Sequence, residues 1–183
     1  MGDPKKLRKK YYTPAHPWNK VAIETERQFC KEYGLVKKKE IYIANSFLKK
    51  YKDIAKRLIA DTTAQGAKEG QQVIEKLQRL GLVQAGAKLD HVLSLELKDI
   101  LERRLQSLIC RKGLARSMKQ ARQYITHRHI TIGSKEITFP SYLASLQEEA
   151  LIAFRERSPL KSEAHPERQP IAAIAKTEVS ISA

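Results

Sequence analysis

The segment GLARSMKQARQYITHRHITIG, residues 113–133, decides the fold of the second half of the chain. Ser117 is followed three residues later by Gln120, the pattern of a capping box in which the first side chain caps a helix and the second reaches back to it. This pattern predicts a helix from residue 118 to about residue 126. The segment holds four Lys or Arg, two His and no acidic residue. Such unbalanced positive charge is typical of a protein whose partner carries the negative charge.

The elements on both sides of this helix predict a small α+β platform. Apolar residues from Leu101 to Ile109 recur at helical spacing and predict one helix over residues 98–112, which Gly113 ends. The alternation in HITI predicts a strand with Ile130 and Ile132 on one side, and EITF a second strand that returns after a turn. We therefore expect two helices joined by a short turn and backed by a β-hairpin.

The side chains that these elements leave outside predict a surface for a nucleic-acid backbone. No acidic residue occurs from Arg103 to Lys135, and the capped helix start adds backbone N–H donors for a phosphate. The binding residues expected here are Arg104, Arg111, Arg116, Ser117, Lys119, Gln120, Arg122, His127, Arg128, His129 and Lys135.

The first twenty residues predict an extended basic arm, because three prolines interrupt any helix. The arm holds six Lys or Arg, two Tyr and one Trp, so it combines groups that attract phosphate with rings that can stack on bases. The binding residues expected in the arm are Lys5, Lys6, Arg8, Lys9, Lys10 and Trp18.

Residues 21–100 predict a helical domain. A first helix is expected from Trp18 to a stop at Gly34, a longer one over residues 38–60, a loop over 61–70 and a short helix over 71–80. The long helix carries an apolar face and, around it, a basic surface. That surface is either an ordinary solvated one or a phosphate-binding one; we favour the latter for Lys49, Lys50, Lys56 and Arg57.

Composition and charge limit the classes of function. The chain has 183 residues, a net charge of +15 and 42% hydrophobic residues, which fits a folded protein with a polyanionic partner. The net charge is +10 over residues 1–60, −1 over 61–100 and +6 over 101–157, which indicates two contact surfaces. No apolar run is long enough to span a membrane, and the start lacks the apolar core of a secretory signal, so we expect a cytosolic protein.

The sequence gives less support to other functions. Cys30 and Cys110 have no metal-ligand spacing, and the two histidines of HRH favour hydrogen bonding to phosphate or ribose over a metal, so no metal or cofactor is expected. An enzyme that carries this domain as an appendage would need a catalytic domain, for which the chain has no motif. A DNA-binding regulator is disfavoured, because a helix of about nine residues that runs into a hairpin fits the major groove poorly.

The residues quoted above carry a family resemblance. The stretch from LERRLQ through residues 113–133 to FPSYL resembles the small RNA-binding domain first described in small-subunit ribosomal protein four. MGDPKKLRKKYYTPAHPW, KEYGLVKKKEIY and the later RSP resemble the archaeal and eukaryotic branch of that ribosomal protein family itself. An RNA-binding protein outside the ribosome stays the alternative.

The resemblance implies a structural protein of the small ribosomal subunit that binds small-subunit rRNA, acts early in assembly and helps to line the mRNA entry side. Implied partners are this rRNA, mRNA and neighbouring proteins, among them number five of the small subunit. The implied organisation is an arm (1–20), a helical domain (21–100), an inserted RNA-binding domain with a strand that returns to the helical domain (102–162) and a flexible tail (163–183). Some family members bind zinc through an N-terminal Cys cluster, which this chain lacks.

Overall fold

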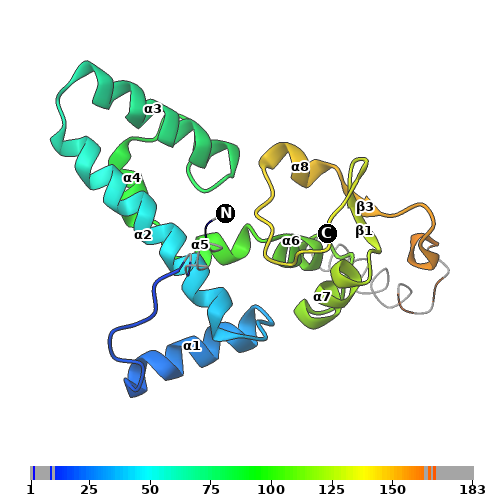
Figure 1. The fold of residues 1–183 in the computed structure, drawn as a ribbon. Helices are drawn as coiled ribbons and strands as arrows, with labels where there is room; N and C mark the ends of the chain where they lie inside the picture. The colour runs from blue at the N-terminus through cyan, green and yellow to red at the C-terminus, as the bar shows by residue number, and fades with distance from the viewer. Residues whose placement is uncertain (1, 3–8, 10, 163–164, 166, 168–183) are drawn as a thin grey trace, which may run out of the picture.

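The computed structural model describes residues 2, 9, 11–162, 165 and 167, arranged as two packed units (Figure 1). The helical unit contains α1 (Lys20–Glu32), α2 (Lys38–Ala60), α3 (Ala64–Arg79), α4 (Leu89–Ser94) and α5 (Leu97–Glu102). The second unit contains α6 (Leu105–Arg111), α7 (Met118–Thr126), β1 (Ile130–Ile132), β2 (Lys135–Glu136), α8 (Leu146–Ala150), β3 (Ile152–Phe154) and the 3₁₀ turn Pro159–Lys161. The expected α+β class is confirmed. Lys5, Lys6, Arg8, Lys10 and nearly all of the expected tail lie outside the described residues.

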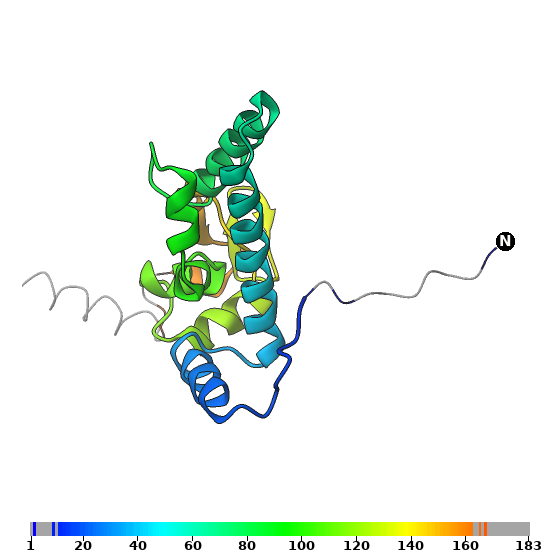
Figure 2. The same ribbon diagram turned by 90° about the vertical axis from the view of Figure 1, so that its left-hand side faces the viewer.

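Helix α2 is the centre of the helical unit. It runs the length of that unit, with α1 at one end and α3 folded back at the other (Figure 2). Its bounds agree with the prediction, and its apolar side chains are buried against the other helices, which is why a helix this rich in lysine is stable. The buried residues of α2 are Ile41, Ala44, Leu48, Tyr51, Ala55 and Leu58.

Two expectations in this unit are wrong. Helix α1 begins at Lys20 with Asn19 as its cap, so it does not begin at Trp18. The loop expected over residues 61–70 is mostly the first part of α3, because the Thr63 hydroxyl accepts a hydrogen bond from the Gly66 N–H at 3.1 Å and caps the helix. A Cβ atom at Gly66 would lie 2.9 Å from Asp61 Cγ, so this glycine marks close packing and not a loop.

The helix expected over residues 98–112 is broken in two. Arg104 has an extended backbone between α5 and α6 and forms an isolated antiparallel bridge with Leu143. The break separates two hydrophobic cores: Leu101 belongs to the core of the helical unit, and Leu105 to the core of the second unit. Sequence periodicity missed it because the leucine spacing continues across Arg104.

The sheet of the second unit has three antiparallel strands in the order β2–β1–β3. The hairpin is present, although β2 is shorter than the expected EITF strand. Strand β3 pairs with β1, placing Ile130 opposite Phe154 and Ile132 opposite Ile152. The expected return of the chain to the helical unit is therefore wrong for β3, since its buried side chains complete the core of the second unit.

The two units are joined closely through Gln106 of α6. Its Nε2 donates to the backbone carbonyls of Tyr33 and Gly34 at 3.2 and 3.3 Å, and of Met118 at 2.7 Å. Gly34 has a φ of +58°, and a Cβ atom there would lie 2.8 Å from Met118 Cβ. The end of α1 and the start of α7 are thus packed with no room for a side chain at Gly34.

Within the described residues, no helix is long and apolar enough to cross a membrane. Over the same residues, no group of three or more His, Cys, Asp or Glu side chains is arranged to hold a metal ion.

Candidate nucleic-acid interface

The start of α7 is capped by Ser117. Its hydroxyl accepts a hydrogen bond from the Gln120 N–H at 3.2 Å, as the sequence predicts. The expected reach of Gln120 back to the Ser117 N–H is wrong by one residue: Gln120 Oε1 accepts from the Arg116 N–H at 2.8 Å, and its Nε2 donates to the Tyr124 hydroxyl at 2.7 Å. Both ends of the Gln120 amide are therefore fixed.

The second unit presents exposed cations before, on and after α7. Arg116, Lys119, Arg128 and Lys135 are exposed, together with His127. Among the described residues, Lys119, Arg128 and Lys135 form no ion pair, so their charge faces solvent. Arg116 instead donates from Nε and Nη2 to the Glu167 carbonyl at 3.1 and 2.8 Å.

Arg128 closes α7 in a conformation that usually requires glycine. Its φ is +61°, the only positive φ of a non-glycine residue that the described chain shows. The Arg128 N–H donates to the Ile125 carbonyl at 3.1 Å and the His129 N–H to the Tyr124 carbonyl at 2.9 Å, the bonds of a Schellman motif. The position keeps a strained, charged residue where glycine would fit more easily, a pattern that is concentrated at functional sites.

His129 is held inside this turn and His127 outside it. The His129 Nδ1 lies 2.9 Å from the Ser158 hydroxyl, and the ring packs edge-on to Tyr124. Burial and the neighbouring charge of His127 lower the pKa of His129 below its ordinary value of 6.5. His129 is thus anchored to the turn after β3, whereas the exposed ring of His127 stacks on that of His129, with the two centroids 6.3 Å apart.

Arg104 does not lie on the outer face, contrary to the prediction. Only 4% of the residue is exposed, and its Nη2 lies 2.5 Å from Glu40 Oε2. Arg122 from α7 approaches the same carboxylate, with Nη2 2.9 Å from Oε1 and Nη1 3.2 Å from Oε2. One acidic side chain of α2 therefore holds two arginines of the acid-free segment. The sequence does not show this, because Glu40 lies 64 residues before Arg104.

The electrostatics of this cluster are those of a partly buried ion pair. Burial alone would raise the pKa of the Glu40 carboxyl, but the hydrogen bonds and charges of Arg122 and Arg104 outweigh it and bring the pKa below its ordinary value of 4.5. Within the described chain, Arg104 Nε and Nη1 are buried without a hydrogen-bond partner. The buried arginine depends on Glu40 for its compensation. Arg111 is also paired, 2.7 Å from Glu102, but stays half exposed.

The expected phosphate-facing residues of α2 lie on the outside. Lys49, Lys50, Lys56 and Arg57 are all exposed, and among these four only Arg57 forms an ion pair with a described residue, Glu69 at 3.9 Å. This basic surface belongs to the helical unit, and the cations around α7 belong to the second unit. The structure therefore carries two separate basic surfaces, in agreement with the two basic blocks of the sequence.

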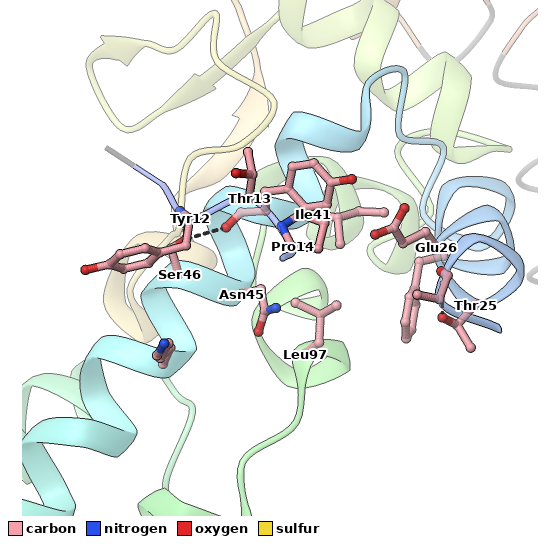
Figure 3. A pocket seen from close by; sticks show the side chains of 13 residues that line it. Tyr12, Thr13, Pro14, Thr25, Glu26, Ile41, Asn45, Ser46 and Leu97 are labelled. Carbon is pink, nitrogen blue, oxygen red and sulfur yellow. Dashed lines mark hydrogen bonds between the residues drawn. The ribbon is translucent and has the colours of Figure 1, made fainter. Parts of the chain in front are cut away.

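The described part of the arm adds to the surface of α2. The Tyr12 N–H donates to the Ser46 hydroxyl at 2.8 Å, which places residues 11–14 across α2 (Figure 3). Lys9 and Trp18 are exposed, Trp18 by 89%.

The expected binding residues did not include Glu40, nor Tyr11 and Tyr12, although the sequence indicated that the rings of the arm can stack on bases. The position of the two tyrosines next to the basic run of the arm could have identified them. For Glu40, the sequence shows only that no other acid is close to it.

Comparison with known proteins places the chain in a family. A family model for the S4 domain matches residues 103–149, from the break before α6 into α8. A protein of Methanococcus maripaludis (strain C7) named "Small ribosomal subunit protein uS4" is 50% identical over 169 residues, which is 92% of this chain and 95% of that protein. Proteins of the same name from Methanococcus vannielii and Methanococcus aeolicus are 49% and 51% identical over the same length.

The chain belongs to the uS4 family. The resemblance identified from the sequence is confirmed, and it extends over both units and not only over the S4 domain. Members of this family are structural proteins of the ribosome and not enzymes, so the enzyme alternative is excluded.

Proposed function

We propose that this protein is a structural constituent of the small ribosomal subunit, in the cytoplasm, and that it binds small-subunit rRNA. The relatives of similar length carry the name of a small-subunit protein. The observation that supports RNA binding most strongly is the set of cations that the second unit leaves exposed: Lys119 in the first turn of the capped helix α7, Arg128 after its end and Lys135 in β2, with no acid in the segment. A capped helix start and exposed cations on the same unit favour a phosphate backbone.

The role in assembly rests on how the two units are joined. Gln106, Gly34 and the Glu40 cluster hold the units together before any RNA is bound, so the two basic surfaces have a fixed spacing. A protein with two prearranged surfaces loses little conformational entropy on binding, which suits early attachment to a folded rRNA junction. We propose that it nucleates early assembly, contacts neighbouring small-subunit proteins, number five among them, and helps to line the mRNA entry side.

Filter binding with transcripts of small-subunit and large-subunit rRNA from the same organism tests the proposal. The expected result is preferential binding to the small-subunit transcript, and co-sedimentation of the protein with small subunits after a high-salt wash. Equal binding to both transcripts, with release in the wash, would indicate a general RNA-binding protein outside the ribosome.

A further inference from the structure

The arm and α2 enclose a groove. This groove is separate from the α7 surface, which is formed by the exposed Lys119, Arg128 and Lys135 of the second unit. Because the Tyr12 N–H is bound to Ser46, and the Ser46 hydroxyl donates to the Tyr42 carbonyl at 2.7 Å, the arm is fixed to one turn of α2. A hollow lies on each side of this crossing. The first, between α1 and α2, contains the carboxylate of Glu26 (Figure 3). The second lies along the outer face of α2 and has a volume of about 700 Å³.

The second hollow combines three kinds of side chain. Its apolar part includes Ile43, which is 45% exposed. The rings of Tyr11 and Tyr12 form a wall, with the Tyr12 residue 71% exposed. Its charged side chains are Lys9, Lys49, Lys50 and Arg57, against the single acid Asp53.

The lysines and the tyrosine rings lie close together. Lys49 Nζ is 5.1 Å from the centroid of the Tyr12 ring, and Lys39 Nζ is 5.6 Å from that of Tyr11. Each ring therefore has a cation within cation–π distance, with part of its surface left to solvent. This places a flat apolar surface beside a positive charge, the arrangement that binds a base together with its phosphate.

Unpaired RNA fits this groove better than other polyanions. A paired stem keeps its bases stacked inside the helix and offers only phosphate and ribose to a tyrosine ring. An acidic peptide could satisfy the lysines but would not use the exposed rings. We propose that the groove that Lys9, Tyr11 and Tyr12 form with the outer face of α2 binds a short stretch of unpaired RNA, with bases on the two tyrosine rings and phosphates on Lys49 and Lys50. This inference rests on the proposed RNA-binding function.

The test uses the full chain, an oligouridylate that carries 4-thiouridine, and a fully paired hairpin RNA. The double variant Tyr11→Ala/Tyr12→Ala should lose at least about tenfold in affinity for the oligouridylate, since stacking on one aromatic ring is typically worth that much. Its affinity for the hairpin should change by less than about twofold, because the α7 surface is intact. Photocrosslinks of the oligouridylate to the wild-type chain should map to Tyr11 or Tyr12.

Two variants control for the ring and for the fold. Tyr11→Phe/Tyr12→Phe keeps both rings and the Tyr12 backbone hydrogen bond, so it should bind the oligouridylate as the wild type does. Phe139→Ala removes another exposed ring, 69% exposed, outside the groove and should have no effect. Thermal melting of each variant should coincide with that of the wild type.

Several outcomes would overturn the inference. Equal losses for the oligouridylate and the hairpin, crosslinks outside residues 9–12 and α2, or competition by polyglutamate as strong as that by unlabelled oligouridylate would each show that the groove does not bind unpaired bases. If the wild type binds small-subunit rRNA tightly and the tyrosine variants bind the oligouridylate normally, only this inference fails. If the wild type binds none of these RNAs, the proposed function fails with it.

Discussion

The arginines between the two units and the cations on the outside of α2 and α7 have the same charge but different surroundings. At the junction, Arg104 and Arg122 share Glu40, and Arg103 lies 2.7 Å from Glu149. On the outside, Lys49 and Lys119 are exposed and form no ion pair with any described residue. The cations of this protein thus form two populations, one at the junction of the two units and one on the outside of α2 and α7. Those at the junction hold the units together, and those outside are available to a partner.

The largest effect should come from removing the shared acid at the junction. Glu40→Ala leaves the buried Arg104 without its compensating charge and should lower the free energy of unfolding by about 3 kcal/mol. Urea unfolding measures this loss. Glu24→Ala, at an exposed position of α1, should stay within about 0.5 kcal/mol of the wild type. Equal losses for the two variants would mean that Glu40 has no special role.

Charge reversal on the outside should affect RNA and leave the fold intact. Lys119→Glu/Lys135→Glu replaces two unpaired cations with acids and should weaken binding to a small-subunit rRNA fragment by about tenfold or more. The melting temperature should stay close to that of the wild type. As a control, Lys68→Glu/Arg79→Glu makes the same change of net charge at two exposed positions of α3, in the neutral part of the chain. Weakening by Lys68→Glu/Arg79→Glu to the same degree would show that net charge alone controls the affinity.

Loss of the helix cap should have an intermediate effect, because it lowers both the stability of the fold and the affinity of the phosphate site. Ser117→Ala removes the acceptor of the Gln120 N–H and should cost about 1 kcal/mol of stability. The N–H groups at the start of α7 should also become less ordered, so RNA affinity should fall at least in proportion. Calorimetry and an RNA titration of the same variant measure the two losses. An unchanged affinity would place the phosphate site elsewhere.

The smallest expected effect is a gain in stability. Arg128→Gly relieves the positive φ of Arg128 and should raise the free energy of unfolding by about 0.5 kcal/mol, since glycine also loses more backbone entropy on folding. The same change removes an exposed cation, so RNA binding should weaken several-fold, by roughly the contribution of one phosphate contact. Arg128→Lys is the matched control, which keeps the charge and the strain. A stabilised Arg128→Gly protein with normal RNA affinity would remove Arg128 from the interface.

The sequence predicted best where local periodicity and capping decide the structure. The bounds of α2 and α7 agree with prediction, because each has an apolar face or a cap that local residues specify. Prediction from the sequence failed where contacts between residues distant in the chain decide the structure. The break at Arg104 depends on Glu40 and Leu143, and the place of β3 depends on pairing with β1. The start of α3 was missed because Gly66 and Gly70 resemble loop residues until their packing against Asp61 and Leu89 is seen.

The candidate site was predicted in the same uneven way. The sequence can identify an exposed cation such as Lys119, because the residue lies off the apolar face of its helix. Most of the expected cations are indeed exposed. The local pattern does not show whether an arginine is paired with an acid many residues away in the chain. For that reason Arg104 was assigned to the RNA surface, although its guanidinium is buried against Glu40.

The salt dependence of rRNA binding tests the division between the two populations most directly. For the wild type, log affinity should fall linearly and steeply with log salt concentration. Lys119→Ala/Lys135→Ala should make the slope shallower by about 0.7 to 0.9 for each lost phosphate contact, and Glu40→Gln, measured where it is folded, should leave the slope unchanged. A flat wild-type response, or the same change of slope in both variants, would contradict the account that outer cations bind RNA and junction cations hold the fold.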